Sequence, residues 1–92
     1  MITVGYGRVE TRSAKGKRLV TLTSTVNGGR VDTYQPNGKM LVEFGADPNG
    51  GLIDILIKTG ESIANMSADE YGNGKVGAYN RKGRGRTLQP RP

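Results

Sequence analysis

The sequence of 92 residues contains no cysteine and no histidine. The absence of cysteine excludes a disulfide framework and a thiolate metal site. The absence of histidine excludes nucleophile–base–acid triads of the usual kind and imidazole metal sites. The sequence also lacks a signal-peptide pattern and an apolar run long enough to span a bilayer. We therefore expect no metal centre, no cofactor and no insertion into a membrane.

Bulky apolar residues are scarce as well. The chain has no tryptophan and one phenylalanine, hydrophobic residues make up 34% of it, and 15 residues are glycine. A chain of this length forms one small domain at most, and small domains bury a modest fraction of their surface. Ordering many glycines adds an entropic cost. A core built from one chain is therefore marginal, and a second copy of the chain is the simplest partner that completes it.

Charge is abundant but unevenly distributed. The formal net charge of the chain is +6. Residues 1–30 carry a net charge of +5, residues 31–72 carry −5 and residues 73–92 carry +6. Basic ends that flank an acidic middle can steer the association of copies with one another.

The main feature of the sequence is a tandem repeat with a period of 22 residues. Residues 7–28 and residues 29–50 match at ten of 22 positions without a gap, and glycine begins each unit. We expect the opening residues to be the end of an earlier unit in a longer array, with Val4 in the place of Leu22. The units are, in order, the remnant of a preceding repeat (1–6), three full repeats (7–28, 29–50 and 51–73), a truncated repeat (74–88) and a proline-containing tail (89–92).

Each unit predicts two short strands and two turns. The first strand of most units alternates valine with polar residues, which favours a strand over a helix. In the turn Pro36-Asn37-Gly38, the proline presets the first torsion and the glycine supplies the left-handed position of a tight hairpin loop. Repeats of about 20 residues usually stack so that each unit buries a face of its neighbour. The predicted strands are residues 8–12, 18–22, 30–34, 40–44, 52–57, 62–66, 75–79 and 85–88.

The third unit departs from the alternation. Residues 52–57, LIDILI, are apolar at every position except Asp54. A strand that is covered on both faces has this composition, so we expect a central strand that is buried on both sides. The alternative is a contact between copies, and in a trimer the two interpretations coincide.

The frame G-x-V-x-x-Y-N-x-x-G, as in GKVGAYNRKGRGRTLQP, resembles the glycine-rich tandem repeats of long bacterial surface proteins and phage-fibre-like proteins. The resemblance covers nearly the whole chain. It is weaker in the third unit, where Leu56 and Ile57 replace Tyr-Asn, and in the truncated fourth unit. Shafts of this kind are commonly homotrimeric β-prisms or triple β-helices whose chains share one core. The resemblance implies a structural role in spacing, display or assembly, outside the cell or on a surface appendage.

We therefore expect an all-β fold that forms a segment of a trimeric β-prism or a β-helical stalk. The alternative is a monomeric eight-strand meander or barrel, designed or minimised, whose first and last strands pair to remove the sheet edges. Apolar residues that recur at equivalent repeat positions are expected to line the shared core and the interface between copies: Val9, Val31, Ile53, Val76, Leu22, Phe44 and Met66.

The carboxylates do not predict a reaction. Glu10, Asp32 and Asp54 share one repeat position, and Asp47 and Asp69 share another, as residues of a solvated face or a turn do. Asp47 and Asp69 lie close to glycines, but their surroundings do not match the spacing of a calcium loop. We expect these two side chains to cap turns, and we expect no catalytic residue and no enzyme activity.

The second candidate function depends on the basic C-terminal segment. Four cations lie close together there, separated by glycines: Arg81, Lys82, Arg84 and Arg86. Such a cluster binds the anionic groups of polyanions and glycans, and Tyr79 is a candidate stacking partner. Tyr34 and Tyr79 share a repeat position and predict a stripe that is either a structural ladder or a ligand surface. The segment has no signature of a nucleic-acid-binding fold, and a solvated chain end is the alternative interpretation.

Overall fold

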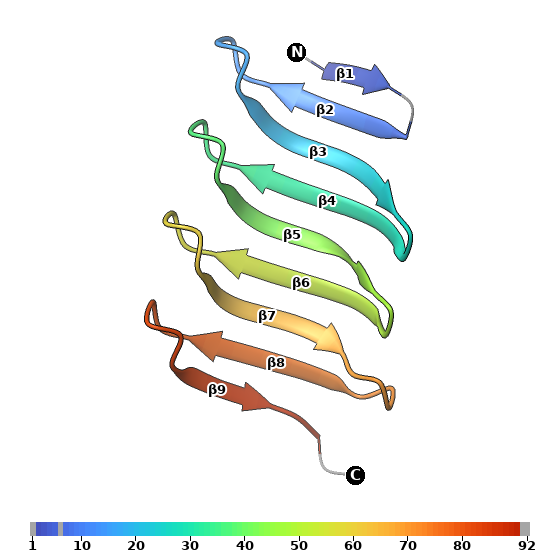
Figure 1. Ribbon diagram of the computed structural model, residues 1–92, viewed down its shortest axis with the longest axis vertical. Helices are drawn as coiled ribbons and strands as arrows, with labels where there is room; N and C mark the ends of the chain where they lie inside the picture. The colour runs from blue at the N-terminus through green and yellow to red at the C-terminus, as the bar shows by residue number, and fades with distance from the viewer. Residues whose placement is uncertain (1, 6, 91–92) are drawn as a thin grey trace.

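The computed structural model describes residues 2–5 and 7–90, and the side chains of residues 7–90. The described chain is one open antiparallel sheet in which nine strands follow one another in sequence order (Figure 1). Its described residues form no helix, and therefore none that is long and apolar enough to cross a membrane. The strands are β1 (Ile2–Gly5), β2 (Arg8–Arg12), β3 (Arg18–Thr25), β4 (Gly28–Tyr34), β5 (Met40–Asp47), β6 (Gly50–Leu56), β7 (Ser62–Ala68), β8 (Gly74–Tyr79) and β9 (Gly85–Leu88).

The all-β prediction is confirmed, and each of the eight predicted strands is present as one of β2 to β9. Alternation of valine with polar residues places one side chain on each face in turn, as a pleated strand requires. The additional strand β1 pairs with β2 on the side opposite β3, so that Val4 and Leu22 both lie opposite Val9. Each 22-residue period therefore corresponds to two neighbouring strands of the sheet.

Two kinds of tight turn connect the strands on the two sides of the sheet. In the turn after β4, the Gln35 amide donates to the Lys39 carbonyl at 2.8 Å, and the Gly38 amide donates to the Gln35 carbonyl at 2.9 Å. Gly38 has a φ of 93°, which favours glycine. The strand register shifts between Thr33 and Tyr34, as in a β-bulge beside a hairpin loop. Since strands alternate in direction, the turns at 13–17, 35–39, 57–61 and 80–84 lie along one side of the sheet (Figure 1).

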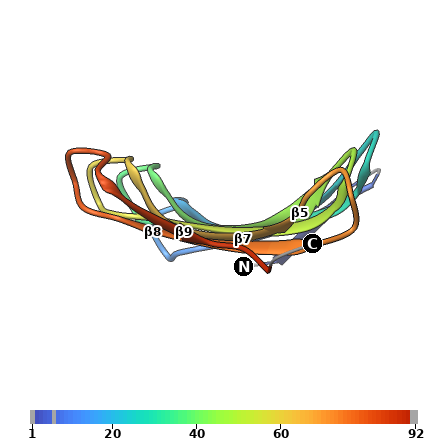
Figure 2. The same cartoon turned by 90° about the horizontal axis from the view of Figure 1, so that it is seen from below.

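The sheet is a single layer. The chain extends 48 × 29 × 13 Å, and the sheet curves along its strands so that both strand ends rise from the middle (Figure 2). No hydrophobic residue is buried among the described side chains. The buried polar and charged residues are instead Glu10, Thr21 and Asp32, with exposed fractions of 6%, 2% and 4%.

Two expectations for the fold need correction. Within one chain, the apolar segment 52–57 is not buried on both sides, because no residue of β6 is buried and no described element covers either face. The sheet is also an open meander and not a closed barrel, since β1 and β9 lie at its opposite ends (Figure 1). In the described part of one chain, the single layer leaves both faces without a covering element.

Candidate functional site

The apolar residues selected from their repeat positions form one continuous row across the sheet. Val9 lies opposite Leu22, and Leu22 lies opposite Val31. Residues that lie opposite each other in antiparallel strands point to the same face, with Cβ atoms about 5 Å apart. The structure therefore brings the whole predicted set together, and it adds Leu88 at the end of the row. The row is, in order, Val9, Leu22, Val31, Phe44, Ile53, Met66, Val76 and Leu88.

A second row of residues runs beside the first on the same face, two positions away along each strand. It includes Val20, Val42 and Ile55, which lie opposite residues of neighbouring strands in the same way. We call the face that carries both rows the apolar face. Its residues remain open to solvent, since Leu22 is 43% exposed and Phe44 is 46% exposed.

A shallow groove of about 460 Å³ marks the middle of the apolar face. Phe44, Ile53 and Met66 line it, together with Gly51 and Gly74. These two glycines lie opposite Ala46 and Ala68, so this stretch of the face carries almost no side-chain bulk beside the long apolar residues. The groove is therefore a place where an apolar side chain from another molecule can pack.

The opposite face is polar, and it holds the buried residues. The Arg12 Nε donates to Glu10 Oε2 at 2.8 Å, and Arg8 also donates to Glu10. Arg30 Nε donates to Asp32 Oδ2 at 2.9 Å. No buried side-chain nitrogen or oxygen among the described residues lacks a hydrogen-bond partner. The deep burial of this row indicates that the polar face is the inner side of the curve.

The electrostatics of this face follow from the pairing. Burial raises the pKa of Glu10, but the hydrogen bonds and charges of Arg8 and Arg12 outweigh it, so the pKa lies below its usual value. The hydrogen bond to Asp32 raises the pKa of Arg30. Among the described residues, no group of three or more acidic side chains is placed to hold a metal ion. Glu10, Asp32 and Glu43 thus serve as partners of arginines within the fold, and Asp54 accepts a hydrogen bond from Ser62.

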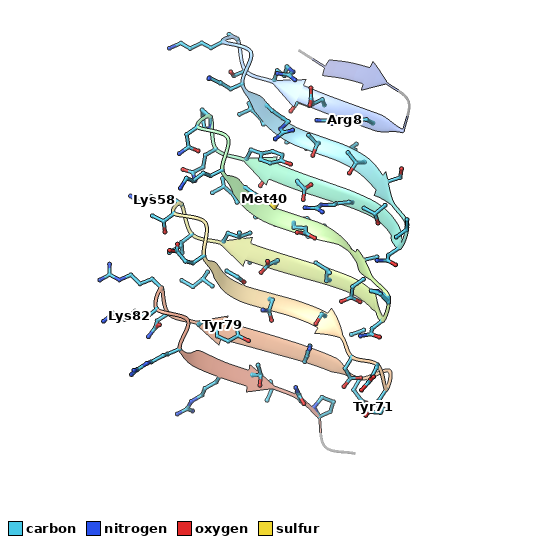
Figure 3. All side chains as sticks on the ribbon, in the orientation of Figure 1. Arg8, Met40, Lys58, Tyr71, Tyr79 and Lys82 are labelled. Atoms are coloured by element: carbon cyan, nitrogen blue, oxygen red, sulfur yellow. The ribbon has the colours of Figure 1, made fainter. Side chains whose placement is uncertain are left out.

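The second surface is the side of the sheet formed by the turns at 13–17, 35–39, 57–61 and 80–84, which we call the basic edge. Lys58 and Lys82 project from this side, and Tyr71 lies on the opposite side (Figure 3). The basic edge carries seven exposed cations and one carboxylate, Glu61. The cations are Lys15, Lys17, Lys39, Lys58, Arg81, Lys82 and Arg84.

Two turns on the opposite side of the sheet carry carboxylates. Asp47 Oδ1 accepts a hydrogen bond from the Asn49 amide at 2.9 Å, and Asp69 Oδ1 accepts one from the Asn73 amide at 2.8 Å. The prediction that these two carboxylates cap turns is confirmed. Glu70 follows in the same loop, so this side of the sheet carries a small negative charge.

The basic edge includes most of the predicted anion-binding residues. Arg81, Lys82 and Arg84 lie in its last turn, and Arg86 follows in β9. The sequence prediction did not include the four lysines of the earlier turns. The signal was available, since each first turn of a unit contains lysine within two residues of its glycine, but the prediction grouped charges by segment and not by turn. Comparison with protein-family models and with curated proteins found no match for this chain.

Proposed function

We propose that the chain is a structural repeat module that works by self-association, with copies covering one another's apolar face. The observation that carries the proposal is the uncovered row from Val9 to Leu88 on a single-layer sheet. Contiguous apolar patches of this kind mark interaction sites in soluble proteins. The module spaces, displays or assembles other parts of a larger structure and performs no reaction of its own.

The size of the exposed surface supports this proposal. The chain exposes 6744 Å². A folded monomer of the same mass exposes about 5,200 Å², so the chain exposes roughly 1,500 Å² more than expected. Each partner in a standard protein interface contributes about 800 Å². The radius of gyration is 15.1 Å, whereas a compact domain of this length has one of about 12 Å.

We propose three copies as the assembly, each with its apolar face toward a common axis. The resemblance to shaft repeats in the sequence implies this number, and a location on a surface appendage follows from the same resemblance. The repeat geometry also supports an elongated assembly, because the sheet grows along one axis as units are added (Figure 1).

The test is the mass of the purified chain in solution, measured by light scattering after size exclusion at low and high salt. We expect three times the chain mass of 9.8 kDa, unchanged by salt because apolar contacts are not screened. A mass of two chains would keep the apolar interface but overturn the trimer. A mass of one chain at every concentration, together with cooperative unfolding, would overturn self-association.

A further inference from the structure

We propose that the basic edge binds an acidic polysaccharide whose chain runs along the row of turns, perpendicular to the strands. The basic edge is a different surface from the apolar face, so this proposal does not rest on self-association. It extends the anion-binding prediction from one segment of the sequence to a surface built from every unit.

The geometry of the basic edge is regular. Neighbouring strands lie about 4.8 Å apart, so successive turns on one side are about 9.6 Å apart and four turns span roughly 29 Å. Each turn is held by hydrogen bonds between its own backbone groups, as between Gly60 and Ile57 at 2.8 Å. Gln35 Nε2 also donates to the Lys58 carbonyl at 3.0 Å, which joins the second turn to the third. The cationic side chains therefore project from an ordered backbone at regular intervals.

The cations of the basic edge outnumber the carboxylates near them in the described part of the chain. None of its seven cations forms one of the ion pairs found among the described residues. The one carboxylate, Glu61, has a lowered pKa, first because Thr59 donates a hydrogen bond to it and also because Lys39 is near. The opposite side of the sheet offers Asp47, Asp69 and Glu70 in its turns. These three carboxylates of a second copy would match fewer than half of the seven cations, which favours a partner with more negative charge.

The chemistry of the basic edge fits acidic sugars better than nucleic acid. Single-stranded nucleic acid binds through aromatic side chains on which bases stack. The Tyr34 ring near the edge is covered by the Arg18 guanidinium, 4.4 Å from the ring centroid. Tyr79 lies over the sheet and not among the turns (Figure 3). Lysine provides compact, hydrated point charges, which suit sulfate and carboxylate groups spaced along a chain.

The first test measures the binding of the full chain to heparin oligosaccharides of increasing length by calorimetry. We expect affinity to rise with length until the oligosaccharide spans the four turns and then to level off, because further sugars gain no new turn. We also expect affinity to fall as salt is raised. An affinity that is independent of length would overturn a row of sites. Tighter binding to single-stranded DNA, or to vesicles of anionic lipid, would overturn the assignment to a polysaccharide.

The second test compares substitutions that remove equal charge. The doubly substituted variants K15A/K17A and R81A/K82A each remove two charges, from the first and the last turn. We expect each to weaken binding by roughly threefold to tenfold, as for two exposed charge contacts. If only R81A/K82A weakened binding, the binding site would be the C-terminal segment alone and the proposal would be wrong.

Single substitutions supply a matched control. Lys58→Ala removes one charge from the basic edge, and Lys75→Ala removes one from β8, outside that edge. We expect weaker binding for Lys58→Ala and unchanged binding for Lys75→Ala, whereas equal effects would show that net charge alone matters. The variants must keep the wild-type mass without glycan, because a changed mass would make the basic edge a contact between copies.

Discussion

Replacing Phe44 with alanine tests the apolar face most directly. Phe44 is 46% exposed in the single chain and lies in the middle of the apolar row. A phenylalanine side chain buries roughly 200 Å², so about 90 Å² remains to be covered in the proposed assembly. At about 25 cal/mol per Å², this area contributes about 2 kcal/mol per copy, or about 6 kcal/mol for three copies. The assembly constant should then fall by roughly ten-thousandfold.

The assay is light scattering over a dilution series, followed by urea unfolding at each concentration. We expect Phe44→Ala to dissociate at concentrations where the unsubstituted chain remains assembled, and its unfolding midpoint to depend strongly on protein concentration. Tyr71→Ala is the matched control, since Tyr71 is an aromatic residue that is 80% exposed in a turn. If Phe44→Ala assembles as tightly as the unsubstituted chain, the apolar face is not the interface.

Three further predictions concern stability, and urea unfolding measures each of them. Gly38→Ala should lower the free energy of unfolding by roughly 1–2 kcal/mol, because an L-residue is strained at the φ of 93°. Gly29→Ala should leave it nearly unchanged, because Gly29 has open space around it and no positive φ. Equal effects of these two substitutions would contradict the turn geometry. Gly85→Ala should detach β9, since a Cβ there would lie 1.9 Å from the Ala78 carbonyl oxygen, and rapid amide exchange confined to β9 would show this. Because the pKa of Glu10 is lowered in the folded chain, its charged carboxylate stabilises the fold at every pH above the ordinary carboxyl pKa. This stabilisation is lost as the pH falls through the lowered pKa. The urea concentration at the midpoint of unfolding should therefore fall less between about pH 7 and about pH 3 in Glu10→Gln than in the unsubstituted chain. An equal fall in both would show that Glu10 does not contribute to the pH dependence.

The strands and the recurring apolar set were predictable because local and periodic signals agree. Val9, Val31 and Ile53 recur at 22-residue spacing, and a constant number of residues per hairpin places such residues in one row. Glycine at the turns sets the length of each hairpin, so little long-range information is needed. The recurrence of the apolar positions was therefore sufficient to identify the row, and the scarcity of apolar residues in one chain agrees with its exposure in a single copy.

The interpretation of residues 52–57 failed for a physical reason. Two apolar faces on one strand indicate burial on both sides only when the fold has layers to supply it. Here Leu52 and Leu56 lie on the polar face and Ile53 and Ile55 on the apolar face, and all four lie in a single-layer sheet. Layer number depends on how far the sheet curves and what covers it, and neither is encoded in the alternation of a single strand.

The basic edge was missed because its charges are far apart in sequence. Lys15 and Lys82 are separated by most of the chain, yet their turns lie on one side of the sheet because every second turn returns to that side. Net charge counted over consecutive segments hides this arrangement. Once the order of the strands is known, counting the charges of every second turn reveals the basic edge.

The meander order also determines how the module responds to tension. Each described strand contacts only its neighbours in sequence, and the first and last strands lie at opposite ends of the long axis (Figure 1). A load applied between the two ends therefore acts across the strands and separates them one after another, beginning with β1 or β9. A fully extended 22-residue unit is about 3.3–3.6 Å long per residue, whereas the two folded strands occupy only about 10 Å of the long axis. Each released pair of strands therefore lengthens the chain by roughly 60–70 Å. A single chain is thus an extensible element, and a stiff shaft requires the contacts between copies to resist the load.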